Sequence, residues 1–150
     1  MRDLKNNVAV VSLLDPVTLT STAIADTKTN YVDLQGYDSA VIAVAYGTVA
    51  TPAENSELIA ILQESDTTTD TDFDTVATTD LIGAFTAVDG AADDNAVQKV
   101  GYIGCKRYIR VLLDITNTGS GLTSVPVAVA AVLGNADTCP VTAPTPAAAS

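Results

Sequence analysis

The chain contains no histidine and no tryptophan, and only seven of its 150 residues are basic. Without imidazole, the sequence lacks the most common general base and the side chain that most often binds transition metals. Carboxylates alone support acid–base chemistry in some enzymes, but no pair of them is singled out here by its spacing. We therefore expect a protein that is not an enzyme, with no cofactor and no catalytic or metal site.

The scarcity of positive charge excludes further classes of function. With 18 acidic residues, the formal net charge is −11, whereas nucleic acids and anionic membranes are bound through Lys and Arg. The longest apolar stretch, residues 122–133, is interrupted by Pro126 and is too short to span a membrane. The apolar stretch at residues 8–11 is too short for a secretory signal. We expect a soluble protein, made in the cytoplasm, that binds neither nucleic acid nor membrane.

Only two cysteines occur, Cys105 and Cys139, and neither belongs to a metal-ligand spacing. Lys106 and Arg107, next to Cys105, would favour its thiolate. A free thiol in a reducing compartment is the preferred interpretation, and a bridge between the two cysteines is the alternative.

Helical periodicity with capping residues is absent, and short runs rich in Val, Ile and Thr recur between turn-forming residues. The expected strands are residues 8–13, 17–22, 31–34, 40–46, 57–63, 73–77, 97–103, 107–114 and 124–133. Regularly spaced short strands predict an all-β fold, an antiparallel β-sandwich of the jelly-roll type with extended terminal arms. We expect one domain over residues 1–138, followed by a Pro/Ala-rich tail over residues 139–150, either free or laid as an arm on another surface.

Two of the expected strands are apolar on both faces. In residues 40–46, bulky side chains alternate with Val41, Ala43 and Ala45, and residues 125–133 repeat the pattern with two further alanines. A solvent-facing sheet surface usually carries polar residues. The small apolar face is therefore either covered by a loop or another subunit, or packed inside a single sandwich.

Residues 97–113 concentrate four of the seven basic residues, and we interpret them as a β-hairpin with its loop at residues 104–106. In its second strand, Ile109 and Val111 alternate with Tyr108 and Arg110. The candidate interaction residues are Lys99, Lys106, Arg107, Tyr108 and Arg110. They pair either with acidic groups on a partner or with the abundant aspartates of this chain.

Acidic residues are concentrated between Glu64 and Asp94. The run from Asp70 to Asp74 has the beginning of a calcium loop, but Thr75 stands where the EF-hand requires glycine. A solvated acidic loop is the preferred interpretation, with a surface calcium site as the alternative.

Three segments together resemble a family of small virion proteins of tailed bacteriophages. They are residues 32–41 (VDLQGYDSAV), residues 62–66 (LQESD) with Phe73 and Val76, and residues 100–111 (VGYIGCKRYIRV), and the opening MRDLKNN adds to the likeness. The resemblance extends over about residues 1–135, in the same order along the chain.

This resemblance implies a β-sandwich head decoration, cement or head-fibre-base protein. The chain would then be a structural component of the outer capsid surface, with the major capsid protein and further copies of itself, as a dimer or trimer, for partners. A carbohydrate-binding or host-adhesion module and a tail or neck component are the alternatives.

Overall fold

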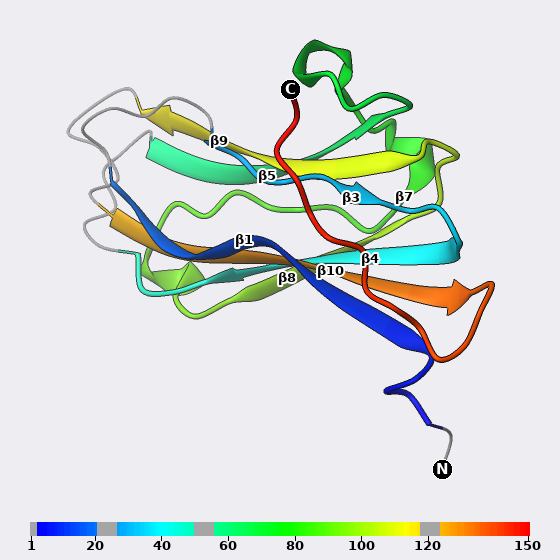
Figure 1. Ribbon diagram of the computed structural model, residues 1–150. Coiled ribbons are helices and arrows are strands. Elements are labelled where there is room, and N and C mark those ends of the chain that lie inside the picture. The colour runs from blue at the N-terminus through cyan, green and yellow to red at the C-terminus, as the bar shows by residue number, and fades with distance from the viewer. Residues whose placement is uncertain (1–2, 21–26, 50–55, 118–123) are drawn as a thin grey trace.

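The computed structural model describes residues 3–20, 27–49, 56–117 and 124–150, which form two antiparallel sheets packed face to face (Figure 1). Sheet A has the strand order β1 (Val8–Thr20), β10 (Ser124–Ala136), β4 (Tyr37–Tyr46), β8 (Val97–Tyr102) and β7 (Leu81–Ile82). Sheet B has the order β2 (Thr27–Lys28), β9 (Tyr108–Asn117), β5 (Ser56–Ser65) and β6 (Asp74–Thr75), and β3 (Val32–Asp33) also pairs with β9.

The chain passes repeatedly from one sheet to the other, so that strands distant in sequence become neighbours. The first and last long strands, β1 and β10, pair in sheet A, and β10 then pairs with β4. This nested order is the jelly-roll arrangement. It confirms the predicted all-β antiparallel sandwich. Among the described residues, no helix has the length and apolar character needed to cross a membrane.

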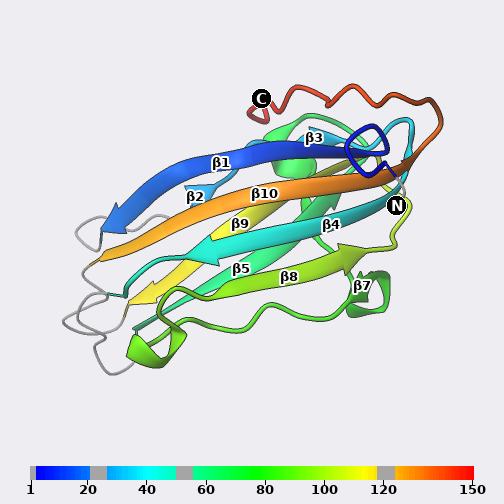
Figure 2. The same ribbon diagram turned by 90° about the horizontal axis from the view of Figure 1, so that it is seen from below.

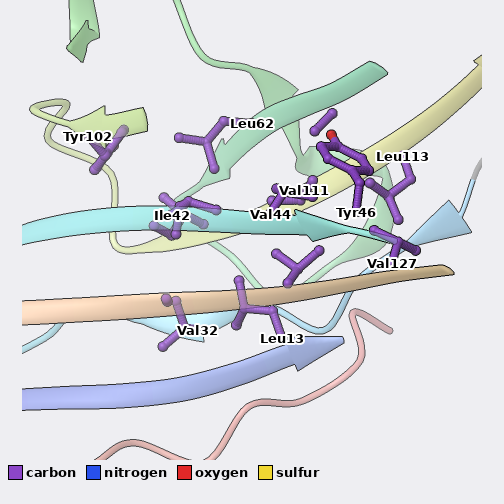
Figure 3. Close-up of a cluster of buried hydrophobic side chains, with 14 of the residues drawn as sticks. Leu13, Val32, Ile42, Val44, Tyr46, Leu62, Tyr102, Val111, Leu113 and Val127 are labelled. Atoms are coloured by element: carbon purple, nitrogen blue, oxygen red, sulfur yellow. The ribbon is translucent and has the colours of Figure 1, made fainter. Parts of the chain in front are cut away.

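The core lies between the two sheets and is built from the bulky faces of the long strands (Figure 3). Ile42 and Val44 of sheet A meet Val111 and Leu113 of sheet B, and all four are fully buried. Strand alternation places every second residue of β4 and β9 in this layer, as the sequence pattern predicts. Val41, Ala43 and Ala45 of β4 therefore point outward, away from the core.

Strand β1 corrects one expectation. The runs at residues 8–13 and 17–22 belong to a single strand up to Thr20, and residues 21–22 lie outside the described residues. The pairing with β10 shifts register between Ser12 and Leu14 and again between Leu14 and Val17. Pro16 has no amide hydrogen to donate, so the strand accommodates it in an irregularity instead of ending there.

The predicted hairpin at residues 97–113 is wrong. Strand β8 lies in sheet A and β9 in sheet B, and the chain between them crosses the thickness of the sandwich. Tyr102 and Ile109, one at each end of this crossing, both point into the core from opposite sheets. A Cβ atom on Gly104 would lie 2.5 Å from the Tyr102 ring, so only glycine fits there. The loop glycine therefore marks a sheet crossing and not a hairpin turn.

Residues 137–150 lie along the sandwich as an extended segment that joins both sheets (Figures 1 and 2). The amide of Tyr31 donates to the carbonyl of Ala147 at 2.7 Å, and the amide of Ala147 donates back at 3.2 Å. The amide of Asp70 donates to the carbonyl of Ser150 at 2.8 Å. The expectation of a free tail, or of an arm on another surface, is thus corrected, because the segment lies on its own domain.

Candidate functional site

A polar cluster surrounds the crossing between β8 and β9. The Tyr102 hydroxyl donates to the Glu64 carboxylate and accepts from the amide of Lys106 at 2.9 Å. Arg107 donates two hydrogen bonds to the Asp33 carboxylate, at 2.7 and 3.0 Å. The segments that carry the phage-protein resemblance contribute all of these residues. The Tyr102–Glu64 bond joins the two sheets at this end of the sandwich, whereas the Arg107–Asp33 pair lies beside the β3–β9 pairing of sheet B.

Arg110 is the most deeply buried charged group of this cluster, with 2% of its surface exposed. Its Nε donates to Gln63 at 2.9 Å, and its two terminal nitrogens donate to the carboxylate and the backbone carbonyl of Asp70. The guanidinium carbon lies 4.1 Å from the centre of the Phe73 ring. Part of the acidic segment is thus a structural cover over sheet B and not a solvated loop.

Ion pairing lowers the pKa of three carboxylates around this cluster. Hydrogen bonds from Lys28, and then from Arg110, hold the pKa of Asp70 below its ordinary value of 3.8, and Lys106 does the same for Asp66. Burial raises the pKa of Asp33, but hydrogen bonding from Arg107 outweighs it. A lowered folded-state pKa contributes stability that is present above pH 3.8 and lost as the pH falls through the folded-state value.

The five predicted interaction residues do not form one surface. Lys106 and Arg107 lie in the crossing, where they pair with aspartates of this chain, and Arg107 also stacks on Tyr108 at 5.0 Å. Arg110 is buried and so is not placed to contact a partner. Lys99 is exposed on the opposite sheet. The interpretation that these basic residues pair within the chain fits all but Lys99.

A groove of about 590 Å³ lies beside the crossing, lined by residues that include Tyr37, Ser39, Cys105 and Arg107. Its polar groups are largely engaged: Tyr37 donates to the carbonyl of Thr142, and Arg107 is paired as above. Both cysteines are free and exposed, in agreement with the preferred interpretation of the sequence. Within the described ranges, no group of three or more acidic or cysteine side chains is arranged to hold a metal ion.

The outer face of sheet A has a different chemistry. Apart from the N-terminal turn at the end where β1 begins, no described segment lies across it (Figure 2). The strand register places Val10, Val132, Val41, Gly101 and Ile82 in one row across all five strands. Val10 is 65% exposed and Ile82 63% exposed. This row is called the apolar ridge below.

Beside the ridge lie two rows of smaller side chains. The register aligns Ser12, Ala130, Ala43 and Lys99 in the first row. The second row contains Ala128, Ala45 and Val97. The four alanines of these rows are called the alanine trough below. Lys99 is the one charged group among the residues of the ridge and the two rows, in a chain of net charge −11. One carboxylate borders these rows, at the edge strand β1, where the Ser12 hydroxyl donates to Asp15 at 2.9 Å. The rest of the face can bury apolar area against another protein surface.

The sequence pattern identified only part of this face. Val41, Ala43 and their counterparts on β10 were expected as a small apolar face, and the structure places them outward. Val10 and Ile82 were missed, because residues 8–11 are apolar at every position and β7 has only two residues. The alternation of Val8 and Val10 with Ala9 and Val11, the latter two of which the structure buries, is the signal that could have extended the face to the sheet edge.

No protein-family model matches the chain, and no curated protein matches it. Among solved structures, it is similar to that of infectious bursal disease virus, Gx strain, with 12% identity over 91% of this chain and 35% of that chain, at a TM-score of 0.48. The structure of the Gt strain of the same virus is similar at 12% identity over 91% of this chain and 34% of that chain, with a TM-score of 0.47.

A third similar structure is the Clostridium thermocellum endo-1,4-beta-D-xylanase 10B, comprising CBM22-1 and GH10 modules complexed with xylohexaose. The identity is 11%, over 93% of this chain and 28% of that chain, at a TM-score of 0.41. The present chain spans about a third of the length of these structures. At such low identity the likeness concerns the fold alone.

Proposed function

We propose that this chain is a non-enzymatic structural protein of a virion, which decorates and cements the outer surface of a tailed-phage capsid and has the major capsid protein as its partner. The observation that carries the proposal is the uncovered apolar outer face of sheet A. Contiguous exposed apolar surface in a strongly charged protein is typical of a surface that becomes buried in an assembly.

The resemblance of the crossing segments to tailed-phage virion proteins supports the choice of assembly. Those segments contribute a contact that joins sheet A to sheet B, the hydrogen bond from Tyr102 to Glu64. A rigid sandwich with one apolar face suits a protein that must occupy many equivalent positions. The negative charge of the remaining surface keeps the free protein soluble at high copy number.

Binding to phage heads tests this proposal. Heads that lack the chain are mixed with purified wild-type protein, with Val41→Lys in the centre of the ridge, or with Thr75→Lys on sheet B as the matched control. Wild-type and Thr75→Lys should sediment with the heads, whereas Val41→Lys should not, because a lysine ammonium would have to lose its water in the buried face. Absence of wild-type protein from the head fraction would contradict the proposal.

The carbohydrate-binding alternative has the groove beside the crossing as its candidate site, with the Tyr37 ring in its lining. A glycan array probed with the isolated protein separates the two functions. Saturable glycan binding that is lost in Tyr37→Ala, together with no binding to heads, would replace the structural role by host adhesion.

A further inference from the structure

We infer that the outer face of sheet A pairs with the same face of a second copy, so that the decorating unit is a two-fold dimer. This inference rests on the proposed function and names a second copy of the chain as the occupant of this face, so that the dimer contacts the capsid through its remaining surface. It is carried by three complementary features on one surface: the apolar ridge, the alanine trough, and a hollow matched to a projecting turn.

The ridge and the trough fit one another when the face meets its own copy. Adjacent rows on a sheet face are about 6.6 Å apart. Consider a two-fold axis that runs parallel to the ridge and lies midway between the ridge and the row that contains Ala130 and Ala43. This axis places Val132 of one copy opposite the partner's Ala130. It likewise sets Val41 opposite the partner's Ala43. The valines of each copy thus face the alanines of the other. The patch is complementary to itself, as a two-fold contact between identical surfaces requires.

Lys99 also has a position in this arrangement. The same axis places it opposite Gly101 of the other copy, beside which the Ile82 side chain lies. The apolar stem of the lysine can pack against this side chain while its ammonium reaches water at the nearby sheet edge. Lys99 is therefore accommodated without an unpaired buried charge, and Asp15, which accepts a hydrogen bond from Ser12, lies on the edge strand β1.

The N-terminal turn, residues 3–7, supplies the third feature. It projects from sheet A at the end where β1 begins (Figures 1 and 2), and Leu4 on it is 70% exposed. A hollow of about 270 Å³ lies towards the other end of the same sheet, lined by Pro16, Ala45 and Pro126 among others. The two-fold axis that sets ridge on trough brings the turn of each copy over the hollow of the other.

The face is also large enough for a stable dimer. At about 16 Å² of sheet per strand residue, the five strands of sheet A present roughly 700 Å², close to the roughly 800 Å² per partner of a standard interface. Two copies of net charge −11 repel one another, and salt screens this repulsion. Dimerisation should therefore strengthen between 0.05 and 0.5 M NaCl.

Sedimentation equilibrium of the purified full chain tests the inference. We expect a dimer for the wild type, at least a tenfold weaker association for Val41→Lys, and a change below about twofold for the Thr75→Lys control. Leu4→Ser should weaken the dimer while leaving the circular-dichroism melting curve unchanged. A monomeric wild type in 0.5 M NaCl, or equal weakening by Val41→Lys and Thr75→Lys, would overturn the inference.

The head-binding assay separates this result from the proposed function. If the wild type is monomeric but Val41→Lys still abolishes head binding, the dimer is wrong and the face docks directly on the capsid. If the wild type is a dimer that Val41→Lys dissociates, and no form binds heads, the dimer stands and the decoration role fails.

Discussion

Two buried tyrosines differ in whether their hydroxyl groups have partners. The Tyr102 hydroxyl has two, Glu64 and the amide of Lys106, whereas the buried Tyr46 hydroxyl has no partner in the described structure. Burial also raises the pKa of Tyr46 to about 12, so the hydroxyl stays protonated at any physiological pH. A buried tyrosine hydroxyl usually has a hydrogen-bond partner, as it does in Tyr102 and does not in Tyr46.

The two tyrosines therefore respond differently to loss of the hydroxyl. Tyr102→Phe should lower the free energy of unfolding by about 1–2 kcal/mol, because it leaves two polar partners near the core unpaired. Tyr46→Phe should leave it unchanged or raise it slightly, since no hydrogen bond is lost. Urea denaturation followed by circular dichroism measures both. Equal losses in the two variants would show that the Tyr46 hydroxyl does have a partner.

Arg110 presents a second residue-level case, because its three hydrogen-bonded contacts and the Phe73 ring surround it completely. Arg110→Met should cost about 3 kcal/mol of unfolding free energy, because Gln63 and the Asp70 carbonyl lose their donors in a buried setting. Arg107→Met, which removes an exposed pair, should have a much smaller effect. A loss in Arg107→Met as large as that in Arg110→Met would contradict this assignment.

At the scale of elements, the sequence predicted most strands but not every connection. Alternation located β4, β5, β9 and β10 to within a few residues, because each long strand has one bulky apolar face. The partner of a strand is not encoded locally. The run around Gly104 has the composition of a hairpin, and only the packing of Tyr102 and Ile109 from opposite sheets makes it a crossing.

The C-terminal segment is a second element whose sequence does not reveal its position. Residues 139–150 are too low in complexity to form a core, yet the pair of hydrogen bonds between Tyr31 and Ala147 fixes them to the sandwich. Such contacts depend on a backbone edge that the rest of the fold presents. The predicted boundary at residue 138 falls close to the end of β10 at Ala136.

Proline substitution tests this attachment. Ala147→Pro removes the amide that donates to Tyr31, whereas Ala148→Pro removes a neighbouring amide for which the structure gives no such bond. Amide hydrogen exchange at Tyr31, measured by mass spectrometry or NMR, should accelerate at least tenfold in Ala147→Pro and far less in Ala148→Pro. Equal exchange rates would show that the segment is not held at this position.

At the scale of the whole molecule, charge and apolar surface are separated. Among the described residues, the ridge and trough of sheet A carry no carboxylate, and the carboxylates of its long strands, Asp15 in β1 and Asp38 in β4, lie outside them. The sequence shows that both faces of β4 and β10 are apolar. The apolar ridge is continuous from Val10 to Ile82 only because of the register of five strands, which the sequence does not show. The account of function therefore depends on one face of one sheet.

A reconstruction of the assembled particle by electron cryo-microscopy tests this account most directly. It should show the jelly roll on the outside of the capsid, with Val41 and Ile82 buried in a contact and the crossing near Arg107 facing solvent or a rim. Density for the chain with the outer face of sheet A open to solvent, or particles that contain no such density, would contradict the account.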